Sequence, residues 1–479
     1  MSEIKVNKVS PRTNCGTVTL GDSGDTITIP AGVSITNSGT ASGFGSTGEV
    51  SWVTTKKTTT FTVTAGEGYF CDTSSGGFTA NLPAGTAGAS FAVADYTNTF
   101  QTGNLTISPN GSQKIGGIAA DAILTTEGQS AYFVYVDDTE GWKNVIDSTS
   151  NILGQTFITA TGGTEITCGN FKIHKFTGPG TFTVSSLSGI SANNKVDYVI
   201  VAGGGGGGNG KAGGGGAGGY RETPGSQTCY TASPLGTSPA AAVVVTAQGY
   251  PVAVGAGGNG SPQPNTPGSA PKGSDGSVST IFSISSAGGG GGGSVDPSHK
   301  NGNPGGSGGG GSQFGGAGTG GTGNSPPVNP AQGTNGGNGF EPGAGGGGGG
   351  AGGAGTNATP QPSQASGGNG GDGVGTEIIA QPNPAAPGIG APGPNAAKRF
   401  FSGGGGAGAA ASPGSGPPGT GGFGGGGTGE DTTPRGGPKC GVANTGGGGG
   451  GTSGPSGGPH TIAGGNGGSG VILIRYKFQ

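Results

Sequence analysis

The chain has 479 residues, of which 124 are glycine, 29% are hydrophobic and 9% are charged. This composition cannot supply one conventional apolar core over the whole length, and a formal net charge of −3 excludes the basic surface of a nucleic-acid-binding protein. The opening residues lack the apolar segment of a secretory signal, and no apolar run is long enough for a membrane span. We therefore expect several small modules and no membrane insertion.

Residues 1–50 predict a small β-rich region for attachment or oligomerisation, because Asp25–Pro30 and Val33–Thr36 alternate apolar and polar side chains. Residues 51–150 predict an all-β module, either a sandwich or a β-prism, with Trp142 as an anchor of its core. The expected strands of this module lie at 58–64, 68–71, 91–94, 105–108 and 131–136.

Residues 151–202 predict further strands, at 171–176, 181–184 and 197–201, which would form a β-scaffold. Residues 203–469 are glycine-rich and contain two further strand regions, near 242–254 and 278–285. The chain closes at 470–479 with an apolar, β-branched run that is typical of a central strand. We expect this last strand to return to the same scaffold after the glycine-rich excursions.

Uninterrupted glycine runs occur at 203–208, 213–216, 288–293, 308–311, 345–350, 403–406, 424–427 and 446–451. A flexible linker is the usual structure of such tracts, while collagen is excluded because blocks such as Ser261–Pro267 break its three-residue period. The third alternative is a bundle of polyproline-II-type helices with three residues per turn and lateral hydrogen bonds. The flanking strands and the similar lengths of the runs favour this bundle. The predicted fold class is therefore mainly β, with small β-modules followed by a β-scaffold that carries a glycine-rich polyproline-II-type helix bundle.

No motif predicts a cofactor, a metal or catalysis. At this glycine content GxGxxG matches arise by chance, and Gly367–Gly375 matches a calcium-binding nonapeptide only once. The three histidines are widely separated, as are the five cysteines, which we expect to be idle thiols. The acidic cluster Asp137–Glu140 predicts a turn, with a glycosidase pair or a calcium site as the less favoured alternatives.

Aromatic and basic residues in the interruptions between glycine runs are the predicted recognition residues, because rigid scaffolds commonly present function on loops. The candidate receptor-binding residues are Tyr220, Arg221, Tyr230, His299, Lys300, Phe340, Lys398, Arg399, Phe400, Phe401 and Phe423. Phe314, Arg435 and Lys439 mark other loops. The segment Lys398–Phe401 is the favoured recognition tip. The alternative for each aromatic residue is that it packs against an end of the bundle.

Two stretches of the chain resemble a known family. Met1–Arg12 and Gly21–Gly32 resemble the N-termini of fibre proteins from marine bacteriophages, notably cyanophages. Tyr198–Gly204, Tyr250–Gly258 and the closing Gly468–Tyr476 resemble the glycine-rich domain found in such fibres. The adhesins at the tips of T-even-type tail fibres are similar in design, with polyglycine helices that present receptor-binding loops.

The resemblance implies a tail-fibre or virion-surface adhesin, made in the host cytoplasm and carried on the virion. It implies a homotrimer that contacts other virion proteins through its N-terminal region and a host glycan or outer-membrane protein through its loops. Two alternatives remain open: a purely structural connector or decoration fibre, and a glycan depolymerase. An ice-binding bundle is disfavoured, since flat arrays of threonine or alanine are not evident.

Overall fold

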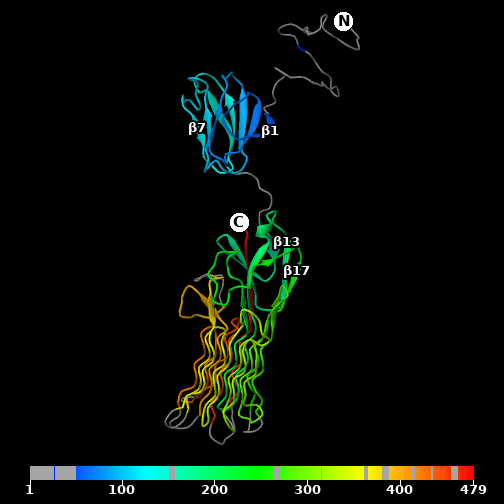
Figure 1. The fold of residues 1–479 in the computed structure, drawn as a ribbon, viewed down its shortest axis with the longest axis vertical. Helices are drawn as coiled ribbons and strands as arrows, with labels where there is room; N and C mark the ends of the chain where they lie inside the picture. The colour runs from blue at the N-terminus through cyan, green and yellow to red at the C-terminus, as the bar shows by residue number, and fades with distance from the viewer. Residues whose placement is uncertain are drawn as a thin grey trace, which may run out of the picture. The chain divides into compact units, whose positions relative to one another are not determined.

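The computed structural model describes residues 26, 50–149, 157–263, 270–313, 315–360, 365–379, 388–410, 416–432, 435–454 and 462–479. The chain forms two compact units, which we call unit 1 (Met1–Ile152) and unit 2 (Leu153–Gln479) (Figure 1). The described residues are mainly β, as expected, with one 3-10 turn at Ser191–Asn193. The predicted strands before residue 50, Cys15 and Phe314 lie outside the described residues.

Unit 1 consists of two sheets between which the chain passes back and forth. The first sheet has the order β1 (Ser51–Lys57), β3 (Glu67–Cys71), β5 (Ser90–Asp95), β8 (Ser130–Tyr135) and β9 (Trp142–Ser148). The second has the order β2 (Phe61–Thr62), β4 (Phe78–Asn81), β6 (Leu105–Ser108) and β7 (Ala122–Leu124). The odd strands β1, β3 and β5 are parallel, as are β2, β4 and β6. The chain thus adds one parallel strand to each sheet per turn, as in a β-solenoid.

The core of unit 1 is aromatic and lies between these sheets. Trp142 is fully buried, which confirms it as a core anchor, and its ring meets that of Phe91 at 5.2 Å. Phe91 also stacks on Phe133, with ring centroids 4.9 Å apart. From the second sheet, Leu105 and Ile107 alternate inward, as the period of a half-buried strand requires.

Unit 2 is built on a six-stranded sheet with the closing strand near its centre. The order is β11 (Thr164–Cys168), β12 (Phe171–Phe176), β24 (Val471–Lys477), β14 (Lys195–Val201) and β15 (Tyr220–Glu222), and β16 (Val243–Val244) also pairs with β14. Strand β24 is antiparallel to both β12 and β14. Its predicted return to the scaffold is therefore confirmed.

Smaller sheets complete unit 2. Strands β10 (Thr159–Thr161), β13 (Gly180–Ser186) and β17 (Gly249–Val252) form a three-stranded sheet. The region near 278–285 is a hairpin of β18 (Ser279–Ile281) and β19 (Ile284–Ser286), and other short pairs are β20 (Val374–Thr376) with β21 (Arg399–Phe401) and β22 (Asp431–Thr432) with β23 (Arg435–Gly436).

The glycine-rich segments of unit 2 lie side by side and are joined by backbone hydrogen bonds with a period of three residues (Figure 1). In the segment 203–208, the amides of residues 203 and 206 donate to 274–277, those of 204 and 207 to 465–468, and those of 205 and 208 to 213–216. These bonds are 2.8–3.0 Å long. The carbonyls of the same segment accept bonds from three further segments, 289–292, 258–261 and 449–452. One glycine run is thus bonded on all sides.

Close approach on every side explains why the inner runs contain only glycine. An ideal Cβ on Gly215 would lie 2.1 Å from the carbonyl oxygen of Gly205. The outer segment 255–261 bonds to three neighbouring segments, 203–208, 274–277 and 464–470, and on its remaining side every third residue carries an exposed side chain, as at Ala256 and Asn259. The repeated spacing of glycine in 255–260 therefore follows from packing, not from a nucleotide-binding loop.

Outer segments also have amides that point away from any neighbouring segment, and polar side chains accept hydrogen bonds from them. Asn335 Oδ1 accepts from the amide of Gly323 and Asn338 Oδ1 from that of Gly320, each at 2.8 Å. The once-matched calcium motif supplies another case, since Asp372 Oδ1 accepts from the amide of Phe423 at 3.1 Å. Buried or partly buried amides rarely remain unpaired, and these side chains supply the acceptors for the outward amides of the outer segments.

Candidate functional site

The glycine-rich segments have two ends, and the predicted recognition residues are divided between them. The sheet end adjoins β14 and β24, and at the opposite turn end the chain reverses, as between Gly208 and Gly213 (Figure 1). The turn end carries His299, Lys300 and Phe340, and the sheet end carries Tyr220, Arg221, Tyr230, Lys398, Arg399, Phe400, Phe401 and Phe423. The structure therefore does not gather the predicted residues into one site.

The expected exposure of three aromatic residues at the sheet end is wrong. Tyr220 is 1% exposed in β15, and Phe400 and Phe401 are 9% and 0% exposed in β21. The rings of Tyr220 and Phe401 lie 6.3 Å apart in a core that includes Val201 and Leu473. Glycine segments offer no side chains, so large residues from the adjoining loops fill the space between the segments and the sheet.

The other predicted residues at the sheet end are partly accessible. Tyr230 is half-buried under the guanidinium of Arg475, 5.4 Å from its ring centroid. Arg221 is half-buried in β15, and Lys398 and Arg399 are half-buried at the start of β21. Phe423 is 50% exposed and is the most accessible aromatic residue of the predicted set.

A group of buried polar side chains, not singled out from the sequence, holds the loops of the sheet end on the sheet. Asp197 accepts hydrogen bonds from the amide and the hydroxyl of Thr228 at 2.9 and 2.7 Å. Arg475 Nη1 donates to the carbonyl of Ile378 at 2.9 Å, and burial lowers the pKa of its guanidinium. Isolated Asp and Arg in otherwise apolar strands were the signal for this group, since buried charges occur where they are bonded.

Glu222 belongs to the same buried region. Its Oε2 accepts from the amide of Ser233 at 2.8 Å, and its Oε1 accepts from the hydroxyl of Thr376. Burial raises the pKa of this carboxyl group, and the hydrogen bonds oppose that rise. Glu222 thus joins β15, the loop at Ser233 and β20.

The turn end presents charged and aromatic groups on tight turns. His299 Nδ1 lies 3.6 Å from Asp296 Oδ1, with 44% of the histidine side chain exposed. Lys300 Nζ donates to the carbonyl of Gly315 at 3.2 Å. Lys211 is half-buried, so burial lowers the pKa of its ammonium group, and nearby Glu341 opposes that shift. Phe340 packs, partly buried, on a cluster of alanines.

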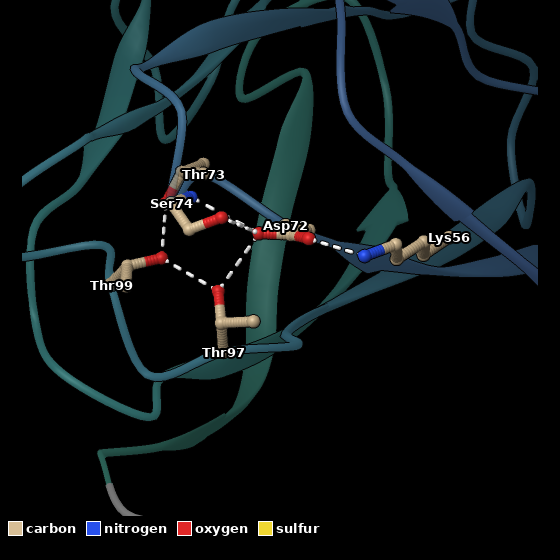
Figure 2. A network of polar contacts seen from close by, with 6 residues as sticks. All are labelled: Lys56, Asp72, Thr73, Ser74, Thr97 and Thr99. Carbon is tan, nitrogen blue, oxygen red and sulfur yellow. Dashed lines mark hydrogen bonds and ion pairs between the residues drawn. The ribbon is translucent and has the colours of Figure 1, made fainter.

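Unit 1 contains a polar network at the end of β3, which Figure 2 shows from close by. Asp72 Oδ2 accepts from Lys56 Nζ at 2.6 Å, and Oδ1 accepts from the hydroxyls of Ser74 and Thr97 at 2.6 and 3.0 Å. The Lys56 hydrogen bond, followed by those of Ser74, lowers the pKa of the Asp72 carboxyl. Both carboxylate oxygens of Asp72 accept hydrogen bonds, so the network fixes the turn.

The acidic cluster at 137–140 forms the predicted turn. Asp137 Oδ1 accepts hydrogen bonds from the amides of Thr139 and Glu140, both at 2.8 Å. Over the described part of the chain, no three His, Cys, Asp or Glu side chains gather as metal ligands would. Within the same ranges no helix has the length and apolar character needed to cross a membrane.

The fold defines a class of β-rich proteins in which a sheet supports layers of glycine-rich chain. A family described as the glycine-rich domain matches residues 176–477, and the chain belongs to this family. The match covers β14, β24 and all the glycine runs between them, so the predicted C-terminal glycine-rich domain is confirmed. No curated protein matches the chain.

Proposed function

We propose that this chain is a fibre-type adhesin of a bacteriophage virion, in which unit 2 binds a receptor on the host surface without catalysis. The resemblance of Met1–Arg12 and Gly21–Gly32 to fibre N-termini motivates the virion assignment. In this proposal the N-terminal region attaches three copies to other virion proteins, and the loops of unit 2 meet a host glycan or outer-membrane protein.

The glycine-rich segments act in this proposal as polyglycine helices of the polyproline-II type. A helix with three residues per turn directs successive amides to three different neighbours, and the bonds of 203–208 have this period. Such a bundle has almost no side-chain entropy to lose at its inner positions. Its stiffness would hold the loops in place before a receptor arrives, which lowers the entropic cost of binding.

The observation that best supports an adhesin is the chemistry of the turn end. His299, Lys300 and Phe340 stand on turns whose backbones are fixed by the inner segments, while the segments themselves offer only small groups. Basic and aromatic side chains on a rigid frame suit recognition of a glycan or a protein. At the sheet end, Phe423 is the most accessible member of the proposed receptor-binding set, and Arg221, Tyr230, Lys398 and Arg399 are half-buried.

Binding of the fluorescently labelled full chain to a panel of marine cyanobacterial strains, measured by flow cytometry, tests the proposal. We expect the wild type to label some strains, and the pair His299→Ala with Lys300→Glu to reduce labelling at least about tenfold. Lys439→Glu is a matched charge change on an outer segment away from both turns, and it should leave labelling unchanged.

Antibody labelling of virions separates the adhesin from a structural fibre. If the antibody labelled virions but the purified chain bound no cells, the connector or decoration protein would be favoured. Release of reducing sugar from host polysaccharide would favour the depolymerase. A solution mass of one copy, measured by light scattering, would contradict the trimer.

A further inference from the structure

A cavity of about 730 Å³ opens in unit 2 between the β16–β17 region and the β18–β19 hairpin. Its volume falls within the range of roughly 300–1,000 Å³ that is typical of small-molecule sites. None of the predicted recognition residues lines it. The cavity is therefore a candidate ligand site separate from the predicted recognition residues.

The apolar part of the lining includes two aromatic rings, together with Val243, Val244, Pro251 and Ile281. Tyr250 on β17 and Phe282 in the hairpin meet edge to face, with ring centroids 5.0 Å apart. The hydroxyl of Tyr250 accepts a 2.7 Å hydrogen bond from the amide of Thr246, which fixes the ring. The ring of Phe282 also lies edge to face with that of the buried Phe182, with ring centroids 6.1 Å apart. Both rings are thus held in position in the protein alone.

The polar part of the lining is uncharged. Hydroxyl and amide groups come from Thr246, Gln248, Thr280, Ser283 and Ser285. Each of these groups can both donate and accept hydrogen bonds, as the hydroxyls of a sugar do. None of the lining residues that the structure describes is Lys, Arg, Asp, Glu or His, so a charged ligand would lose its hydration without gaining a counter-charge.

The hairpin turn that closes the cavity is held in an unfavourable conformation. Phe282 and Ser283 have φ angles of 54° and 62°, the left-handed values of a two-residue turn that glycine and asparagine normally occupy. Neither side chain is selected by the turn itself. Strain of this kind clusters at binding sites, where the surrounding structure maintains it. Here it places the Phe282 ring and the Ser283 hydroxyl at the cavity.

We propose that this cavity is a binding site for a neutral saccharide, with the pyranose C–H face against Tyr250 and Phe282 and its hydroxyls bonded to Gln248 and Ser285. Apolar rings beside neutral donors and acceptors match the two kinds of surface on a sugar. The site is separate from the turn-end loops and goes beyond the adhesin function, since it would exist in a structural fibre as well.

The test uses the full chain on a printed array of neutral hexose and N-acetylhexosamine oligosaccharides, together with sialylated and sulfated ones. We expect binding to at least one neutral oligosaccharide and none that requires an acidic group. Calorimetry with the strongest neutral ligand should show that both Gln248→Leu and Ser285→Ala bind at least about fivefold more weakly than the wild type. Each variant loses hydrogen bonds to the sugar. Ser285→Trp fills the cavity and should abolish binding.

Ser277→Ala is the matched control: it removes an exposed hydroxyl near the hairpin but outside the cavity, and its affinity should equal that of the wild type. Circular dichroism checks that each variant is folded. An array without neutral ligands, or equal affinities for Gln248→Leu, Ser285→Ala and the wild type, would overturn the site while leaving cell binding through the turn end untouched. If the wild type bound no glycan and Ser285→Trp changed the oligomeric state, a second copy would cover the cavity, and the saccharide site would be overturned as well.

Discussion

At the scale of single residues, the inner glycines are set by backbone contact. The amide of Gly215 donates to the carbonyl of Gly449, its carbonyl accepts from the amide of Gly405, and a Cβ added to it would lie 2.1 Å from the carbonyl oxygen of Gly205. A methyl group there meets backbone, which cannot rotate away as a flexible side chain can. The inner runs are therefore less tolerant of alanine than an ordinary loop, in contrast to the usual view of glycine-rich chains.

Gly215→Ala should lower the free energy of unfolding of unit 2 by about 2–4 kcal/mol, from overpacking and at least one lost hydrogen bond. Gly178→Ala is the matched control, because a Cβ there meets nothing within 4 Å. Urea unfolding followed by far-UV circular dichroism measures both. Equal stability of the two variants would contradict close packing of the inner segments.

The buried Glu222 predicts a pH dependence of unit 2. Burial raises the pKa of its carboxyl above the ordinary 4.5, so the folded chain retains a proton that the unfolded chain releases. The contribution of this carboxyl group to the free energy of unfolding is therefore complete below pH 4.5 and is lost as the pH rises through the pKa of the folded chain. Tyr220 and Tyr230 beside it remain neutral over this range, because burial raises their pKa values well above 10.0.

Glu222→Gln removes the titration and keeps an oxygen that can accept from Ser233 or Thr376. The drop in unit 2 stability between pH 4.5 and pH 8 should therefore be smaller in Glu222→Gln than in the wild type, when both are measured by urea unfolding at each pH. Identical pH profiles would show that this carboxyl is ionised at no cost in the folded chain. Asp137→Asn, in the exposed turn of unit 1, is the control for a general charge effect.

The burial of some individual side chains could be predicted from the sequence, and that of others could not. Trp142, near the end of the predicted β-module, indicated a core position, and it is one. Tyr220 and Phe401 resembled loop tips because glycine flanks them, yet they are buried. In a glycine-rich chain the apolar pattern around an aromatic residue is lost, so the sequence does not show which way the ring points.

At the scale of elements, periodicity predicted the strands that carry side chains. Strands β6, β12 and β24 lie close to their expected ranges, because their alternating or continuous apolar residues are unambiguous. The region 278–285 was expected as one strand and is a hairpin, since Phe282 and Ser283 are not typical turn residues. The parallel pairing of β1, β3 and β5, and of β2, β4 and β6, could not be predicted, because strand pairing between distant segments has no local signal in the sequence.

The outer segments allow a prediction about single amides. Asn338 Oδ1 bonds the outward amide of Gly320, whereas the inward amide of Gly321 bonds the carbonyl of Gly309. Asn338→Ala should speed hydrogen exchange of Gly320 by about fivefold and leave Gly321 unchanged, because a single hydrogen bond is lost at the surface. Residue-resolved exchange by NMR measures both amides.

Asn338→Asp keeps the acceptor and serves as the control, with exchange of Gly320 as slow as in the wild type. If both amides exchanged faster in Asn338→Ala, the side chain would be maintaining the whole segment and not a single surface bond.

At the scale of the whole molecule, the chain has two units with separate cores. Among the described residues, the aromatic core of unit 1 consists of residues of unit 1, and the two clusters around β24 consist of residues of unit 2. Both tryptophans of the chain, Trp52 and Trp142, belong to unit 1. Tryptophan fluorescence therefore reports the unfolding of unit 1 inside the full chain.

This separation predicts that damage to one core stays within its unit. Phe91 is fully buried between Phe133 and Trp142, so Phe91→Ala should destabilise unit 1 by about 3–5 kcal/mol and shift the fluorescence transition to lower urea. The circular dichroism transition of unit 2 and its saccharide affinity should stay as in the wild type, because the cavity between β17 and the β18–β19 hairpin draws only on unit 2. A parallel loss of saccharide binding would mean that unit 1 supports the fold of unit 2, and the binding activity would then belong to the whole chain and not to its glycine-rich domain.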